Sequence, residues 1–177
     1  MRSCLLPALA LLAASPVAAQ GRPAAQAPAA QGVDAFARAA AQNSLSEMLM
    51  SSLALQRSKD DRVQDYAWTM IDHHARATGD LAEALPDGAA VLPTEPSPEQ
   101  QAALRRMQGL SGAQFDQAYF QHQLDAHRRA VALYEGGTRL PDPRVSDYAR
   151  STLPILRAHE EIARTKQAQP PRPAPGD

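Results

Sequence analysis

Apolar residues recur every three or four positions along most of the chain, and no convincing stretch alternates between apolar and polar residues. The first spacing is typical of amphipathic helices and the second of strands. One apolar stripe predicts a helix from about Val33 to Arg57, and the short connection "SKDD" (58–61), which contains a capping candidate, follows it. A second stripe starts at Val63 and stops at Pro86, because proline ends or kinks a helix. We expect these two helices to form a hairpin.

The second half of the chain begins with a long connection. The segment "PDGAAVLPTEPSP" (86–98) is rich in proline and predicts a crossover, and a short helix is expected near 98–108. Ser111 and Gln114 have the spacing of a capping box, in which the serine accepts a backbone N–H and the glutamine reaches back. A third long helix is therefore predicted to begin here.

Glycine and proline mark the boundaries of the last two helices. Gly136 and Gly137 follow the apolar stripe of the third long helix and are expected to end it. Asp142 and Pro143 then have the residue types of an N-cap and a first helical turn. Four long helices, with two hairpins and one long crossover, predict an all-α fold: a ferritin-like four-helix bundle whose crossover carries a short extra helix.

The two ends of the chain differ from its middle in composition. Residues 1–19 have the basic start, short apolar run and small residues of a signal peptide, and they contain the only cysteine, Cys4. Residues 20–32 form a Pro/Ala/Gln-rich linker, and 169–177 a proline-rich tail predicted to be disordered. The helical domain is expected at 33–168. No run approaches the roughly 18 apolar residues of a membrane helix, so we expect an exported protein that is periplasmic or associated with the outer membrane.

Charge and motifs limit the classes of function. Removal of Arg2 with the signal peptide changes the formal net charge from −1 to −2, and no run of like charges occurs. This balance gives no electrostatic case for binding nucleic acid or an anionic membrane surface. The chain has no glycine-rich phosphate loop, nucleophile elbow or dinucleotide fingerprint. Enzymatic activity is therefore not indicated, and an envelope protein partner or self-association is left open.

Four ionisable residues lie on the apolar, core-facing stripes, one on each long helix: Glu47, His74, His127 and His159. Imidazole with one carboxylate is a donor set that suits Zn, Cu, Fe or Ni. The chain contains no Glu-x-x-His motif, which argues against a dinuclear iron site. These four residues are the predicted ligands of a single transition-metal ion.

Spacing along the helices tests whether the four side chains can meet. Glu47 lies about thirteen residues before the first hairpin and His74 about fourteen after it, so they are expected at the same height. His127 lies about nine residues before the end of its helix, whereas His159 lies about sixteen after the start of the next. This predicts a mismatch of about 10 Å, unless the loop climbs alongside a helix end or Pro154 bends the helix.

A structural explanation competes with the metal site. A Glu47–His74 hydrogen bond, with His127 and His159 bonded to backbone, water or Tyr119, would account for the inward polar residues without any ion. The sequence favours this explanation, a structural or interaction module of the cell envelope; the alternative is a periplasmic bundle that binds Zn, Cu or Fe. His73 and His122 are expected to be surface residues.

Several motifs resemble one protein family. The segments that carry the resemblance are "FARAAAQNSLSEM" (36–48), "VQDYAWTMIDHH" (63–74), "FDQAYFQHQLDAH" (115–127) and "LPILRAHEEIA" (153–163). They resemble the DUF4142 family of exported bacterial proteins, which are often labelled outer-membrane proteins and considered ferritin-like. The family usually has Asp-His where this chain has His73 and His74. The resemblance therefore implies a role for His74 and leaves His73 as a departure, and it implies no established reaction.

Overall fold

The computed structural model describes residues 28–86 and 92–169, and every regular element in these two ranges is helical. The predicted all-α class is confirmed. The elements are α1 (Pro28–Arg57), α2 (Asp61–Ala84), α3 (Pro98–Gln108), α4 (Gly112–Gly137) and α5 (Pro143–Gln167). The predicted signal peptide, most of the linker, part of the crossover and almost all of the tail lie outside the described residues.

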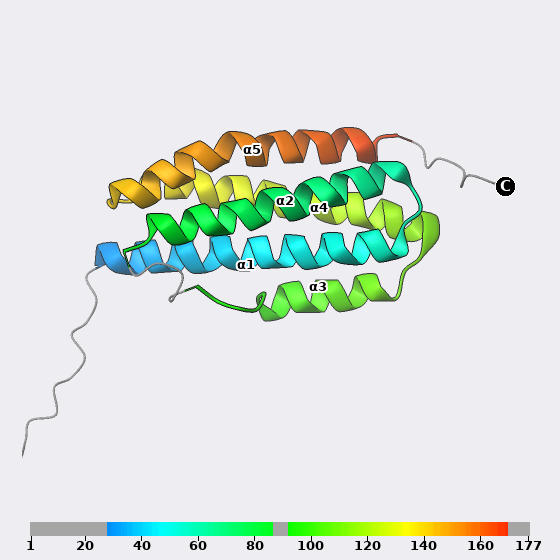
Figure 1. Cartoon of the computed structure of the whole chain (residues 1–177), viewed down its shortest axis with the longest axis horizontal. Coiled ribbons are helices and arrows are strands. Elements are labelled where there is room, and N and C mark those ends of the chain that lie inside the picture. The colour runs from blue at the N-terminus through cyan, green and yellow to red at the C-terminus, as the bar shows by residue number, and fades with distance from the viewer. Residues whose placement is uncertain (1–27, 87–91, 170–177) are drawn as a thin grey trace, which may run out of the picture.

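The four long helices pack as two hairpins side by side (Figure 1). Helix α1 packs against α2 and α4 packs against α5, while α1 also contacts α4 and α2 contacts α5. The short helix α3 runs along the outside of α1, within the connection that joins the end of α2 to the start of α4 (Figure 1). This is the predicted four-helix bundle, with one long crossover that carries a short extra helix.

The helix boundaries agree with the prediction at some ends and differ at others. Asp60 and Asp142 are N-caps, and the side chain of Asp142 accepts from the backbone N–H groups of two residues in the first turn of α5. Helix α1 begins at Pro28, five residues before the predicted start and inside the predicted linker. At the other end of the bundle α4 starts at Gly112, close to its predicted beginning.

The capping box lies on α3 and not, as predicted, at Ser111. Ser97 and Gln100 exchange the two hydrogen bonds that define the motif. Ser111 makes no side-chain cap bond, because Gly112 turns the chain with a φ of +52°, and the backbone oxygen of Ser111 accepts from Phe115 N at 3.3 Å. A positive φ at this position favours glycine.

The core consists of two apolar clusters that are separated along the bundle. The first contains Phe36, Leu81 and Tyr134 among others, and the second contains Met50 and Met70 with a group of aromatic rings. In the first cluster the helices approach closely, since a Cβ at Gly137 would lie 2.5 Å from Cε2 of Phe36. Between the two clusters each long helix carries at least one buried polar residue: Ser44 and Glu47 on α1, His74 on α2, His127 on α4 and His159 on α5.

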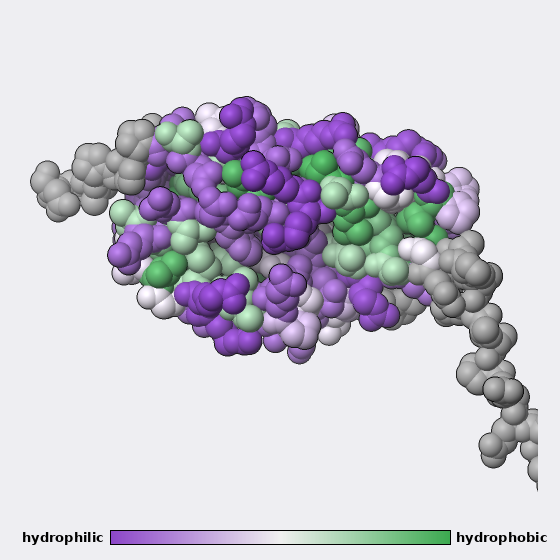
Figure 2. Space-filling model, turned by 180° about the vertical axis from the view of Figure 1, so that it is seen from behind, coloured by the Kyte–Doolittle hydropathy of each residue, from purple (hydrophilic) through white to green (hydrophobic). Residues whose placement is uncertain are grey.

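The face of the bundle opposite that of Figure 1 is mainly polar. On the face opposite that of Figure 1, hydrophilic residues cover most of the bundle and hydrophobic residues gather in patches between them (Figure 2). The largest exposed fractions of large apolar residues belong to Trp68 on α2, at 62%, and Leu49 on α1, at 47%. The buried polar residues between the two clusters are the candidates for a functional site.

Candidate metal centre

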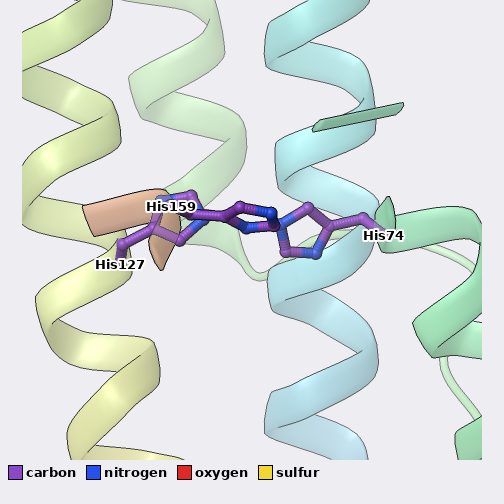
Figure 3. Close-up of side chains that lie close together, drawn as sticks. All are labelled: His74, His127 and His159. Atoms are coloured by element: carbon purple, nitrogen blue, oxygen red, sulfur yellow. The ribbon is translucent and has the colours of Figure 1, made fainter. Parts of the chain in front are cut away.

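Three histidines from three helices meet in the polar layer between the clusters. His74 on α2, His127 on α4 and His159 on α5 point toward one another (Figure 3). One ring nitrogen from each lies within 4.8 Å of the other two, and the residues are 3%, 1% and 2% exposed. The rings of His127 and His159 meet edge to face with their centroids 5.1 Å apart. The structure thus brings together three of the four predicted ligands.

Each histidine uses one ring nitrogen for a hydrogen bond and leaves the other free. His127 Nδ1 donates to the backbone oxygen of Gln123, at 2.9 Å, one turn earlier in α4. His74 Nδ1 lies 3.3 Å from Oγ of Ser44 on α1. The remaining nitrogens, Nε2 of His74, Nε2 of His127 and Nδ1 of His159, are buried and have no hydrogen-bond partner.

This bonding pattern is the one that ligating histidines show. A metal-binding histidine usually donates its second ring N–H to a backbone carbonyl, a carboxylate or water, which fixes the tautomer and the ring orientation. His127 meets that description directly, because a backbone carbonyl can only accept. Its Nε2 therefore carries a lone pair, and that lone pair faces the centre of the layer.

Burial keeps all three histidines neutral. Loss of hydration lowers the pKa of His127 to about 4 and that of His159 to about 3, and the charged form of each is further disfavoured by neighbouring histidines. The pKa of His74 is lowered for the same reason, first by burial and then by His127, His159 and His73. Neutral imidazole is the form that binds metals, so no proton has to leave these rings at neutral pH.

Glu47, the fourth predicted ligand, lies outside this group of nitrogens. The α1 residue that contacts His74 is Ser44, three residues before Glu47, or about 4.5 Å along the helix. The carboxylate of Glu47 is 1% exposed and neither oxygen has a hydrogen-bond partner. The predicted Glu47–His74 hydrogen bond is therefore wrong, and Tyr119 bonds to Ser51 at 3.0 Å and not to a histidine.

The carboxylate of Glu47 is shielded from solvent, and nearby positive charge stabilises its ionised form only weakly. Burial raises its pKa from 4.5 to about 7, and the Gln123 side chain and the charge of Arg129 offset part of this shift. Gln123 is fully buried, and its side-chain nitrogen and oxygen have no hydrogen bond of ordinary geometry. Glu47 and Gln123 thus form a second group of unpaired polar atoms, about one turn from the histidines.

The predicted height mismatch between His127 and His159 is wrong. His127 lies ten residues before the end of α4 and His159 sixteen after the start of α5, a difference of six residues or about 9 Å. Helix α5 begins beyond the end of α4 and so absorbs this offset (Figure 1). Its axis also bends near the middle (Figure 1), where Pro154 lacks the N–H of a regular helical hydrogen bond.

The two histidines predicted at the surface have different positions. His73 is exposed, as predicted, yet its Nδ1 lies 2.8 Å from Nε2 of His159 and the two rings stack with centroids 5.0 Å apart. His122 is half-buried and its Nε2 has no partner, and burial lowers its pKa to about 4. The contact of His73 with His159 was missed, and the only signal for it was the adjacency of two histidines at 73 and 74.

The arrangement suits one ion with an open coordination position. Three imidazole nitrogens are the protein ligands of several tetrahedral zinc sites, and the metal–nitrogen bonds are about 2.0–2.1 Å long. Tetrahedral geometry then requires nitrogens about 3.3 Å apart, and the three ring nitrogens lie within 4.8 Å of one another, so small movements of the rings bring them to the distance that an ion requires. The fourth position would be left for Glu47 or for a solvent ligand.

Comparisons with known proteins agree with the sequence motifs. The model of one family, described as a domain of unknown function (DUF4142), matches residues 18–165. Neither a curated protein nor a solved structure matches the chain. Among the described helices, none combines the length and the apolar character needed to cross a membrane. Because the matched region covers most of the chain, this protein belongs to the DUF4142 family.

Proposed function

We propose that this protein binds a single transition-metal ion through His74, His127 and His159. The observation that carries the proposal is the group of three neighbouring histidines, each of which has one buried ring nitrogen without any hydrogen-bond partner. Buried polar atoms in native proteins are nearly always paired, and those that are not require an explanation. An ion supplies that explanation for all three nitrogens at once.

The competing explanation, a hydrogen-bonded structural network, accounts for fewer of these atoms. It satisfies the second nitrogen of each ring through Gln123, Ser44 and His73. It leaves one buried ring nitrogen of each histidine, Nε2 of His74, Nε2 of His127 and Nδ1 of His159, without a partner. It also leaves both oxygens of Glu47 unpaired.

Glu47 and Gln123 have a defined place in the proposed centre. They lie about one turn from the histidine layer, and their side chains are the nearest unpaired acceptors and donors on α1 and α4. A solvent molecule in the fourth coordination position can donate to the carboxylate of Glu47 and accept from the Gln123 amide. Three neutral imidazoles and one oxygen suit Zn(II) and Cu(II) best.

The proposed setting is the cell envelope. The signal-like residues 1–19 favour export. The proposed ligands lie inside the bundle, so the site does not depend on the segments at the two ends of the chain. The proposed role is metal binding without catalysis. Self-association and an envelope protein partner remain compatible with it.

Metal binding can be measured on the chain without its predicted signal peptide and without a His-tag. After chelator treatment and titration with Zn(II), elemental analysis is expected to find one equivalent per chain. Co(II) is expected to give the intense visible bands of a tetrahedral site. His74→Ala, His127→Ala and His159→Ala should each lower the affinity by orders of magnitude, whereas the matched control His122→Ala keeps it. Absence of bound metal after supplementation would overturn the proposal.

A further inference from the structure

We infer that His73, an exposed residue outside the three proposed ligands, is the positioning residue of His159 and sets the preference of the centre among metal ions. The inference rests on the proposed metal site. It assigns a role to a residue that lies off the apolar stripe of its helix and was expected to do nothing more than face solvent.

The contact between the two rings is close and specific. His73 Nδ1 lies 2.8 Å from Nε2 of His159, which is a normal hydrogen-bond distance, and the ring planes are inclined by only 20°. The bond joins α2 to α5 directly beside the histidine layer. A second bond on the same two helices, from Tyr66 Oη to the backbone oxygen of His159 at 3.1 Å, holds the main chain of the ligand residue.

The direction of the bond follows from what lies at the other side of the His159 ring. Nδ1 of His159 is buried and has no hydrogen-bond partner, and the ring lies beside those of His74 and His127. If Nδ1 carried the hydrogen, a buried N–H would have no acceptor, which is rare in native structures. His159 therefore donates from Nε2 to Nδ1 of His73, and its Nδ1 lone pair faces the centre.

The chemical nature of the acceptor determines the charge of the centre. A carboxylate often accepts from a ligating histidine and makes it more basic, and in that case it also adds a negative charge next to the ion. His73 is a neutral acceptor of the same geometry, so it fixes the ring of His159 without adding charge. With His73 as the acceptor, no negative charge lies next to the ion. The centre therefore prefers divalent over monovalent ions less strongly than it would with a carboxylate at this position.

The geometry allows this acceptor to be exchanged without moving the backbone. In histidine Nδ1 is bonded to Cγ, and in aspartate and asparagine Oδ1 is bonded to Cγ, so all three acceptors reach the same place. A surface cavity of about 210 Å³, lined by His73, His159, Arg76 and Asp80 among others, borders the pair. Solvent in this cavity can hydrate a carboxylate at position 73, which keeps its desolvation cost low.

Three substitutions at one position separate the hydrogen bond from the charge. His73→Asn keeps a neutral acceptor and is expected to keep the Zn(II) and Cu(II) affinities within about threefold, and His73→Ala removes the acceptor and should lower them by about 10–100-fold. His73→Asp keeps the acceptor and adds a charge, so it should raise both affinities by about tenfold. It should also favour Cu(II) over Cu(I), which a lower reduction potential would report.

A spectroscopic measurement on the metal-free protein tests the positioning role by itself. In ¹⁵N-edited spectra, His159 is expected as the Nε2–H tautomer in the native chain and in His73→Asn, and as a mixture in His73→Ala. Helical circular dichroism and melting temperatures should remain unchanged, because position 73 is exposed.

The outcomes distinguish this inference from the proposed function. If the native chain binds no metal, the proposed function fails, and a fixed His159 tautomer would still support the positioning role of His73 while ending its role in metal preference. If metal binds with the same affinity in all three variants, the inference about His73 is wrong and the metal site stands. An equal effect of His73→Asn and His73→Ala would overturn the hydrogen bond as the cause.

Discussion

The two apolar clusters and the histidine layer between them follow opposite rules for buried polar groups. In the clusters, the polar atoms of large side chains are paired: Tyr134 and Tyr148 share a hydrogen bond of 2.9 Å, and Ser51 bonds Tyr119 at 3.0 Å. In the layer, His74, His127 and His159 each leave a buried ring nitrogen unpaired. The clusters therefore supply the stability that permits the layer to keep unpaired groups.

Burial has opposite effects on the free energy of folding in the clusters and in the layer. An apolar side chain in a cluster gains free energy on leaving water, about 25 cal/mol for each Å² of buried apolar surface. A polar atom in the layer loses hydration, and the cost is about 1–3 kcal/mol for each group that finds no partner. Changes in the two regions should therefore act on different measured quantities, stability in one case and metal binding in the other.

The largest expected effect is the stabilisation of the histidine layer by metal. An ion that binds only the folded state stabilises it by about 4 kcal/mol when the free ion exceeds its dissociation constant a thousandfold. Addition of Zn(II) to the chelator-treated protein should therefore raise the melting temperature, and a chelator should reverse the rise. In His159→Ala the rise should disappear. A melting temperature that does not respond to Zn(II) in the native chain would remove the distinction between the two regions.

A cavity in the first apolar cluster should have the converse effect. Leu81 is 1% exposed and packs in that cluster, and Leu→Ala changes in cores cost about 3–5 kcal/mol because a cavity remains. Leu81→Ala should lower the free energy of unfolding by this amount in urea. Its Zn(II) affinity should stay within about threefold of the native value under conditions where the protein is folded. A large loss of affinity would show that cluster and layer are coupled.

The pH dependence of the metal-free protein should reveal Glu47. Its pKa is 4.5 in an unfolded chain and about 7 in the folded protein. Because the folded value is raised, the folded state binds the proton more tightly, and the contribution of Glu47 to stability is complete below pH 4.5 and is lost as the pH rises through 7. Glutamine has no such loss, so Glu47→Gln should become more stable relative to the native chain as the pH rises, by on the order of 3 kcal/mol.

Urea titrations between about pH 5 and 8.5 in the presence of a chelator measure this difference. The histidines of the layer are present in both proteins, so their titration largely cancels when the two are compared. Glu47→Asp serves as a control that keeps an ionisable group. A difference in stability between Glu47→Gln and the native chain that is constant over this range would contradict the raised pKa.

The same division explains what the sequence could predict. The apolar stripes fixed the number and approximate limits of the long helices, because helical periodicity depends on neighbouring residues alone. The inward direction of His74, His127 and His159 followed from their places on those stripes. Their buried positions agree with that expectation.

The relative heights of residues on different helices could not be predicted in the same way. The level of His159 depends on how far α5 extends beyond α4 (Figure 1), which the loop and the packing decide together. An error of three residues, about 4.5 Å, was enough to replace Ser44 by Glu47 as the expected partner of His74. Contacts such as that between His73 and His159 depend on these heights and on ring rotation, and periodicity carries no information on either.

The smallest expected effect belongs to the ion pairs of the outer surface, which lie in neither region. Arg157 Nη2 on α5 lies 2.8 Å from Oε1 of Glu135 on α4, and the two side chains are 58% and 47% exposed. Water screens such pairs, and exposed ion pairs contribute only about 0.2–1 kcal/mol. Arg157→Ala should therefore lower the free energy of unfolding by less than about 1 kcal/mol, and the effect should shrink in 1 M NaCl because salt screens exposed charges. Glu135→Ala is the matched control, and the double mutant should lose little more than either single mutant. A loss as large as that of Leu81→Ala would mean that the surface contacts between α4 and α5, and not the apolar clusters, hold the histidine layer in place.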